Sequence, residues 1–253
     1  MSFDVAADAY DRFMGRYAVP LAPEFADFAR IERNQRVIDV GSGPGALTDE
    51  LVRRVGSDSV VAVDPSEPFV AALRQRRPNV RVEVASAEAL PFADDEFDAA
   101  LAQLVVHFMS DPVAGLAEMA RVTRSGGIVA ACTWDFGSDR APLSLFWSVA
   151  RELDGSAPGE SALAGTHEGQ LTELFARAGL EDVEETGLEI STEHLSFEEW
   201  WEPYTFGVGP VGSYVARLDE ERRTALRERL RERLPPSPFV VSARAWAARG
   251  RVR

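Results

Sequence analysis

The sequence predicts an α/β fold, a doubly wound and mostly parallel sheet with helices on both faces. Between residues 36 and 134, short apolar segments alternate with amphipathic ones, and this rhythm is typical of parallel strands joined by crossover helices. A glycine-rich turn follows the first apolar segment. Two later apolar segments, separated by a helical insertion, predict an antiparallel edge strand.

Each expected strand is a short apolar run that ends at turn residues. The expected strands are residues 37–40, 60–63, 81–85, 97–101, 128–134, 183–190 and 239–247. The first helix is expected at 46–55, because Leu47, Leu51 and Val55 recur on one helical face. Further helices are expected at 68–76 and from Pro112 to the Gly126-Gly127 pair, where the glycines would stop the helix.

The rest of the chain has helical and aromatic patterns. A stripe of apolar residues from Leu171 to Ala178 predicts a helix, and residues 197–206 are rich in aromatic side chains. A charged helix with leucines on one face is expected before Pro235. We therefore divide the chain into an N-terminal helical lid (1–32), a Rossmann-like cofactor-binding core (33–192), a helical cap insertion (193–236) and a final strand that returns to the sheet (237–253).

Composition excludes several classes of protein. The 253 residues are 45% hydrophobic and 27% charged, as in ordinary soluble domains. The net charge of −14 argues against a large nucleic-acid partner. No apolar run reaches the ~20 residues that a membrane span needs, and the N-terminus lacks a signal-peptide pattern. We expect a cytoplasmic protein without membrane insertion, and no metal site, because the three histidines and Cys132 are scattered.

The glycine-rich turn is the most informative motif. Gly41, Gly43 and Gly45 allow a tight turn and a close approach to a ligand, and the following helix offers free N–H groups at its N-terminus. Asp64 ends the next strand, where a carboxylate can bind ribose hydroxyls. Asp64 could instead cap the following helix. The motif predicts a nucleoside-containing ligand beyond the carboxyl ends of the strands.

Two ligand classes fit this turn. Gly41-x-Gly43-x-x-Ala46 satisfies a permissive dinucleotide fingerprint. Asp39, however, precedes the first glycine by two residues, where its carboxylate would point into the cofactor pocket. An anion there is unfavourable beside a pyrophosphate and favourable beside an ammonium group. Asp39 therefore favours a ligand with an ammonium group over a nicotinamide dinucleotide.

Four stretches carry a resemblance to a known family. They are VIDVGSGPGA (37–46), VVAVDPSEP (60–68), ASAEALPFADDEFDAALA (85–102) and RVTRSGGIVAACTWD (121–135). Over about residues 30–135 the chain resembles the class I S-adenosylmethionine-dependent methyltransferases. It is most similar to the small-molecule branch that includes ubiquinone- and menaquinone-biosynthesis enzymes. The resemblance implies S-adenosyl-L-methionine as cofactor, S-adenosyl-L-homocysteine as product and a small-molecule acceptor.

The resemblance also implies roles for particular residues. Asp39 and the three glycines would surround the methionine part, Asp64 would hold the ribose, and Gln103 would face the methionine end. Many relatives have Gly-Asp where this chain has Ala85-Ser86, so Ser86 or the backbone of Ala87 would contact the adenine. The implied cofactor-binding residues are Asp39, Gly41, Gly43, Gly45, Asp64, Pro65, Ser66, Ser86, Ala87, Glu88 and Gln103.

The candidates for catalysis and acceptor binding are less specific. An oxygen or carbon acceptor needs a base, for which His107 is the first candidate and Tyr17 the second; His107 could equally be a packing residue. Acceptor-binding candidates, each of which could instead belong to the core, are Tyr10, Met14, Trp200, Trp201 and Tyr204.

The leading hypothesis is in-line transfer of a methyl group to an O, N or C nucleophile of a small organic acceptor, by a monomer or homodimer. Two alternatives remain open. The chain could bind S-adenosylmethionine without catalysis, or it could be an NAD(P)-dependent oxidoreductase.

Overall fold

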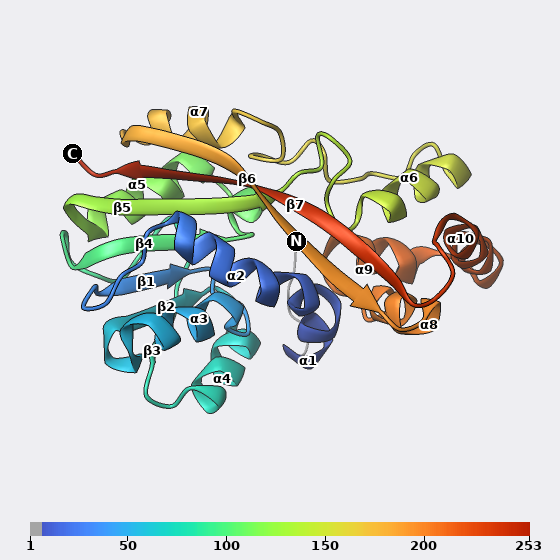
Figure 1. Cartoon of the computed structure of the whole chain (residues 1–253), viewed down its shortest axis with the longest axis horizontal. Helices are drawn as coiled ribbons and strands as arrows, with labels where there is room; N and C mark the ends of the chain where they lie inside the picture. Colours follow the sequence, from blue (N-terminus) through green and yellow to red (C-terminus); the bar gives the residue numbers. More distant parts are fainter. Residues whose placement is uncertain (1–6) are drawn as a thin grey trace.

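The computed structural model describes residues 7–253 and has a seven-stranded sheet in the order β3-β2-β1-β4-β5-β7-β6 (Figure 1). β1, β2, β3, β4 and β5 are parallel, whereas β7 runs antiparallel to both of its neighbours. This sheet confirms the predicted fold class. The predicted antiparallel edge strand is β7, but it lies one place in from the edge of the sheet. The edge itself is formed by β6. The strands are β1 (Val37–Val40), β2 (Val60–Asp64), β3 (Arg81–Val84), β4 (Phe97–Gln103), β5 (Thr123–Trp134), β6 (Glu181–His194) and β7 (Phe239–Arg251).

Helices cover both faces of the sheet because inward side chains alternate along each buried strand. On β4, Ala99 and Leu101 belong to the core under α2, α3 and α4, whereas Ala100 and Ala102 belong to the core under α5 and α7. The order in which strands are added to the sheet reverses between β1 and β4, and such a switch point opens a crevice at the carboxyl ends of the strands. The helices of these two layers are α2 (Arg16–Phe28), α3 (Ala46–Val55), α4 (Glu67–Arg76), α5 (Pro112–Val122) and α7 (Gln170–Arg177).

The end of α5 differs from the sequence prediction. The helix ends at Val122 and β5 begins at Thr123, so the prediction that the Gly126-Gly127 pair stops the helix is wrong. Thr123 donates a hydrogen bond from its hydroxyl to the carbonyl of Met119, and its backbone pairs with Phe97 on β4. Tertiary pairing with β4 therefore ends the helix before the glycines.

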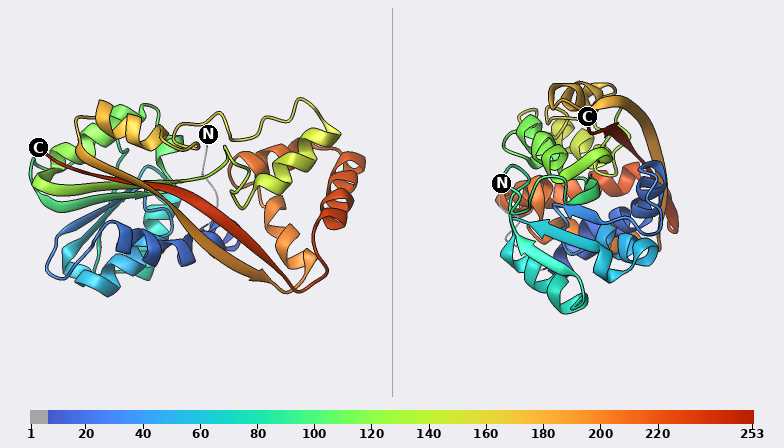
Figure 2. Two further views of the ribbon diagram at one scale, coloured as in Figure 1. Left: turned by 45° about the horizontal axis from the view of Figure 1, so that its top comes forward. Right: turned by 90° about the vertical axis from the view of Figure 1, so that its left-hand side faces the viewer.

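The cap lies at the end of a two-stranded ribbon. β6 and β7 pair along their whole length, from Glu181 opposite Arg251 to His194 opposite Phe239, and the ribbon leaves the sheet to reach the cap (Figures 1 and 2). Between these strands lie α8 (Phe197–Trp201), the turn η4 (Glu202–Thr205), α9 (Gly209–Arg217) and α10 (Glu220–Arg233).

One helix of this region was not predicted. α6 (Ser144–Leu153) follows β5 and packs against α10. Its buried residues Phe146 and Trp147 contact the cap tyrosine Tyr214 edge to face. The N-terminal segment is helical as expected, with α1 (Ala7–Tyr10), η1 (Asp11–Gly15) and α2. Among the described residues, no helix is long and apolar enough to cross a membrane.

Candidate active site

A cavity of about 1170 Å³ opens where the parallel strands end. It is lined by residues that follow β1, β2, β3 and β4 and by the end of α1. Most of the predicted cofactor-binding residues lie on it. Those on the lining are Gly41, Gly43, Asp64, Pro65, Ser66, Ser86, Ala87, Glu88 and Gln103. Asp39 and Gly45 lie outside the lining.

Asp64 is fixed at the end of β2 by two backbone groups. The N–H of Gly43 donates to Oδ2 and the N–H of Ser66 donates to Oδ1, both at 2.8 Å. Burial raises the pKa of the Asp64 carboxyl, whereas these two N–H groups lower it. The two hydrogen bonds orient the carboxylate at the cavity wall and connect the glycine turn to β2.

The three glycines of the turn have different surroundings. All have positive φ, which L side chains rarely adopt. A methyl group on Gly41 would lie 2.5 Å from Val105, and one on Gly45 would lie 2.5 Å from Leu73. At Gly43 the nearest atom would be Cε1 of Tyr10, 4.0 Å away. Gly41 and Gly45 therefore permit close packing, whereas Gly43 leaves open the space beside the cavity.

Asp39 lies beneath the turn and is 1% exposed. Its Oδ2 accepts a hydrogen bond from the hydroxyl of Thr48 on α3. Its Oδ1 has no hydrogen-bond partner among the described residues. Burial raises the pKa of the Asp39 carboxyl to about 7. A buried acceptor atom without a donor is costly, so Asp39 is suited to a ligand that brings a donor or a positive charge.

Glu88 and Gln103 both use part of their polar groups within the protein. Oε1 of Glu88 accepts a hydrogen bond from the N–H of Ser110 at 2.8 Å, which fixes the segment before α5. Nε2 of Gln103 donates to the carbonyl of Ala18 on α2 at 3.0 Å, and its Oε1 has no partner in the described chain. Gln103 thus connects the end of β4 with the N-terminal helix.

The N-terminal segment covers the glycine turn. The ring of Tyr10 packs edge to face against Phe69 of α4, with 5.3 Å between centroids. Arg76 connects the two parts directly, since it donates one hydrogen bond to the carbonyl of Pro44 and another to the carboxylate of Asp11. The segment before α2 is therefore fastened to the turn that it covers.

A second cavity of about 30 Å³ adjoins the first. Tyr10, Leu104, His107 and Phe108 line both. His107 is buried, its Nδ1 has no hydrogen-bond partner among the described residues, and burial lowers its pKa to about 3. The imidazole is therefore neutral near pH 7, with a nitrogen lone pair available. Met14, predicted to bind the acceptor, lines the small cavity and accepts a hydrogen bond on sulfur from Trp134.

The remaining candidates for catalysis and acceptor binding line neither cavity. They are Tyr17, Trp200, Trp201 and Tyr204. Tyr204 packs against Phe13, with 5.2 Å between ring centroids, and against Trp200 and Trp201. Tyr17, the second candidate base, lies with its hydroxyl 3.3 Å from Nε2 of His194. These four predicted residues, Tyr17 and the aromatic residues of α8 and η4, form the contact between the N-terminal segment and the cap.

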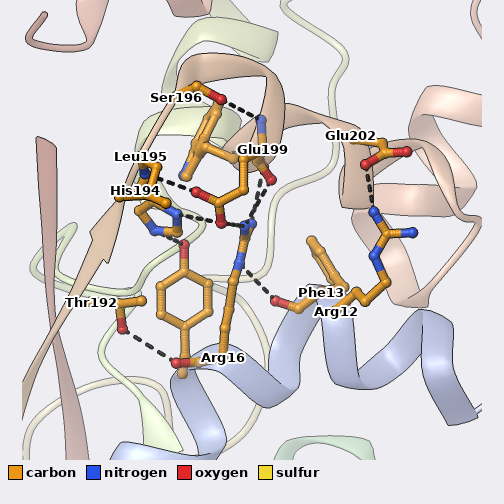
Figure 3. A network of polar contacts seen from close by, with 11 residues as sticks. Arg12, Phe13, Arg16, Thr192, His194, Leu195, Ser196, Glu199 and Glu202 are labelled. Atoms are coloured by element: carbon orange, nitrogen blue, oxygen red, sulfur yellow. Dashed lines mark hydrogen bonds and ion pairs between the residues drawn. The ribbon is translucent and has the colours of Figure 1, made fainter. Parts of the chain in front are cut away.

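Figure 3 shows the polar part of this contact. Arg16 donates hydrogen bonds to the carbonyls of Phe13, Glu199 and Trp200. Thr192 on β6 donates to the carbonyl of Arg16. The side chain of one arginine thus holds the start of α2 against α8.

Sequence patterns missed Arg76 and Glu160. Arg76 and Arg74 are both exposed arginines of α4, so nothing in the sequence distinguishes Arg76. Glu160 lies in an irregular segment between α6 and α7 and lines the small cavity. Its place depends on packing between distant segments, which no local motif encodes.

Comparison with known proteins agrees with the motifs. Residues 38–131 match the family model described as a methyltransferase domain. An uncharacterized methyltransferase of Mycobacterium tuberculosis is 40% identical over 127 residues, which are 50% of this chain and 49% of that protein. Residues 38–131 therefore form a methyltransferase domain of the kind that the sequence motifs indicated.

The same part of the chain is similar to further proteins. The demethylmenaquinone methyltransferase of Mycobacterium sp. (strain KMS) is 39% identical over 111 residues, 44% of this chain and 46% of that protein. The chain thus spans about half the length of the curated relatives it matches. The crystal structure of the YcgJ protein from Bacillus subtilis has the same fold, with a TM-score of 0.59 and 19% identity over 94% of this chain and 98% of that one.

Proposed function

We propose that this chain is a methyltransferase that binds S-adenosylmethionine in the large cavity and transfers its methyl group to an O, N or C nucleophile of a small organic acceptor. The observation that carries the proposal is Asp64, whose carboxylate two backbone N–H groups hold at the wall of a cavity flanked by the glycine turn. A carboxylate held in this way can accept hydrogen bonds from both hydroxyls of a ribose.

The buried polar atoms also fit the cofactor. Oδ1 of Asp39 lacks a donor, and the ammonium group of the methionine part would supply one. Gly43 leaves space that a side chain would fill. Ser86 and Ala87 lie on the same cavity beyond β3, in the place proposed for the adenine. The cavity is larger than one cofactor needs, so it has room for part of the acceptor.

The bound cofactor supplies a methyl group activated by a sulfonium. The chain's own residues then have to orient the acceptor and exclude water. Tyr10 and Met14 of the N-terminal segment line the small cavity, and Leu104 and Phe108 add apolar side chains to the same lining. The neutral imidazole of His107 can accept a hydrogen bond from the nucleophile, whereas its low pKa makes it a weak base. We propose that these residues form the acceptor side of the site.

The proposal extends to the setting of the reaction. The formal charge of −14 supports a small molecule rather than a nucleic acid as acceptor. Among residues 7–253 there is no group of three or more His, Cys, Asp or Glu side chains that could hold a metal ion. We propose a cytoplasmic monomer or homodimer that needs no metal.

Calorimetric titration with S-adenosylhomocysteine, with NADH as control ligand, tests the proposal. Micromolar binding of S-adenosylhomocysteine alone is expected. Binding of NADH instead would favour the oxidoreductase hypothesis. Binding without methyl transfer to any of a broad set of alcohols, phenols, amines and quinols would favour a non-catalytic cofactor-binding protein.

A further inference from the structure

The small cavity has apolar walls and one carboxyl group. Phe13, Met14, Trp134, Leu143 and Val211 are among its apolar lining residues. Among residues 7–253, Glu160 is the one acidic residue on this lining, and it is 3% exposed. A carboxyl group in such surroundings is costly unless a partner compensates for its lost hydration, so its presence calls for an explanation.

The described residues compensate for only part of the hydration that the Glu160 carboxyl loses on burial. Nε1 of Trp147 on α6 donates a hydrogen bond to Oε1 of Glu160 at 2.8 Å. Among the described residues, no arginine or histidine forms an ion pair with Glu160. Burial raises the pKa of this carboxyl to about 7, and the hydrogen bond from Trp147 lowers it. The hydrogen bond from Trp147 therefore fixes Oε1 of Glu160, and the described residues supply no cation to the carboxyl group.

The indole of Trp147 does not itself require a carboxylate. A neutral amide or a backbone carbonyl could accept the same hydrogen bond without the cost of burying an acid. Trp147 is also held by ring contacts with Phe146 and Tyr214. The acidic group is thus better explained by a ligand that enters the cavity than by packing.

We propose that Glu160 anchors the acceptor, by accepting a hydrogen bond from a hydroxyl or amino group on an otherwise apolar molecule. This inference rests on the proposed function, since it places the acceptor beside the cofactor cavity. The shared wall of Tyr10, Leu104, His107 and Phe108 puts the two cavities next to each other.

The size and charge of the small cavity define the class of acceptor. About 30 Å³ is the room of roughly one small polar group. The apolar body of the acceptor therefore extends into the large cavity. Carboxylate and phosphate groups are disfavoured above pH 7, where the Glu160 carboxyl is ionised and repels an anion.

Four probes that share one ring test this inference: benzylamine, benzyl alcohol, benzoate and toluene. Each is titrated into the complex with S-adenosylhomocysteine and followed by ligand-observed NMR. We expect benzylamine and benzyl alcohol to bind at least tenfold more tightly than benzoate and toluene. Glu160→Gln retains an acceptor for Trp147 and should weaken benzylamine binding at least tenfold. Glu168→Gln, an exposed neighbour on the same segment, is the matched control and should change nothing.

The outcomes separate the two proposals. If S-adenosylhomocysteine does not bind the native chain, the proposed function fails. If it binds but benzoate binds as well as benzylamine, if no probe binds, or if Glu160→Gln keeps the native preference, the role of Glu160 is overturned. Unchanged binding of S-adenosylhomocysteine by Glu160→Gln, with unchanged circular dichroism, shows that the variant folds.

Discussion

The hydroxyl of Tyr17 lies 3.3 Å from Nε2 of His194, and both side chains are fully buried. Tyr17 belongs to α2 and His194 ends β6, so this hydrogen bond joins the N-terminal segment to the strand that leads into the cap. Burial lowers the pKa of His194, and Nδ1 lies 3.5 Å from the carboxylate of Glu199. This buried contact adds to those of Arg16 and Phe13 in holding the N-terminal segment against the cap.

Tyr17→Phe should lower the free energy of unfolding by about 1–2 kcal/mol, because it leaves a buried nitrogen of His194 without its partner. Urea unfolding measures this change. Tyr214→Phe is the control, since the hydroxyl of Tyr214 makes no hydrogen bond to the part of the chain that the structure describes, and should cost less than about 0.5 kcal/mol. If Tyr17→Phe also abolished methyl transfer while cofactor binding was kept, Tyr17 would be the base instead of His107.

Asp64→Ala should weaken S-adenosylhomocysteine binding by about 1.5–3 kcal/mol, the range for hydrogen bonds to a charged group. The variant removes the proposed ribose contact and leaves the N–H groups of Gly43 and Ser66 without their acceptor. Calorimetry measures the affinity, with the exposed Asp58→Ala as control. An unchanged affinity would place the ribose elsewhere.

Gly43→Ala should weaken cofactor binding at least tenfold, because its methyl group would occupy space that the protein leaves open beside the cavity. Gly169→Ala is the matched control: the backbone there is left-handed too, with φ 81° and ψ −18°, and nothing lies within 4 Å of the added carbon. Both substitutions should cost about 1 kcal/mol of stability through backbone strain. Equal cofactor affinities in the two variants would show that Gly43 is needed only for the turn.

Cofactor affinity should rise with pH between about 5 and 7. The pKa of Asp39 is about 7 in the free protein, and a bound ammonium group favours the ionised carboxylate. Binding below pH 7 must therefore release a proton, which weakens it as the pH falls. Titrations from pH 5 to 8 measure this dependence. Asp39→Asn should flatten it, and a native profile already flat over this range would argue against contact between Asp39 and the ammonium group.

Glu160→Gln should gain stability relative to the native chain as the pH rises. The pKa of Glu160 is raised from 4.5 to about 7 in the folded state, so the folded chain binds this proton more tightly than the unfolded chain. Protonated Glu160 therefore contributes fully to the free energy of unfolding below pH 4.5. This contribution, at most about 3 kcal/mol, is lost as the pH rises to 7. Urea unfolding of both proteins at pH 5 and pH 8 measures the difference. Parallel pH profiles would mean that the folded protein does not perturb this carboxyl.

The sequence was sufficient for features with a local origin. The strand at residues 37–40 and the helix at 46–55 were predicted with their observed bounds, because apolar periodicity and glycine conformations act over a few residues. Asp64 could be predicted to face the crevice because strand ends share one edge of the sheet. The early end of α5 depends on pairing with β4, and α6 and Glu160 depend on packing across the chain. Such contacts leave no periodic signal in the sequence.

The cap could be replaced by another segment, because the ribbon of β6 and β7 brings its two ends together. His194 and Phe239 are paired across the ribbon, so the chain leaves and rejoins the sheet at adjacent points. A segment with neighbouring ends can be exchanged for one of another length without rerouting the strands. The large cavity is lined only by residues up to Leu163, whereas Val208 and Val211 of the small cavity lie between those two points. Exchanging residues 195–238 between relatives is therefore expected to alter the choice of acceptor. The residues up to Leu163 that line the large cavity would stay unchanged and continue to bind the methyl donor.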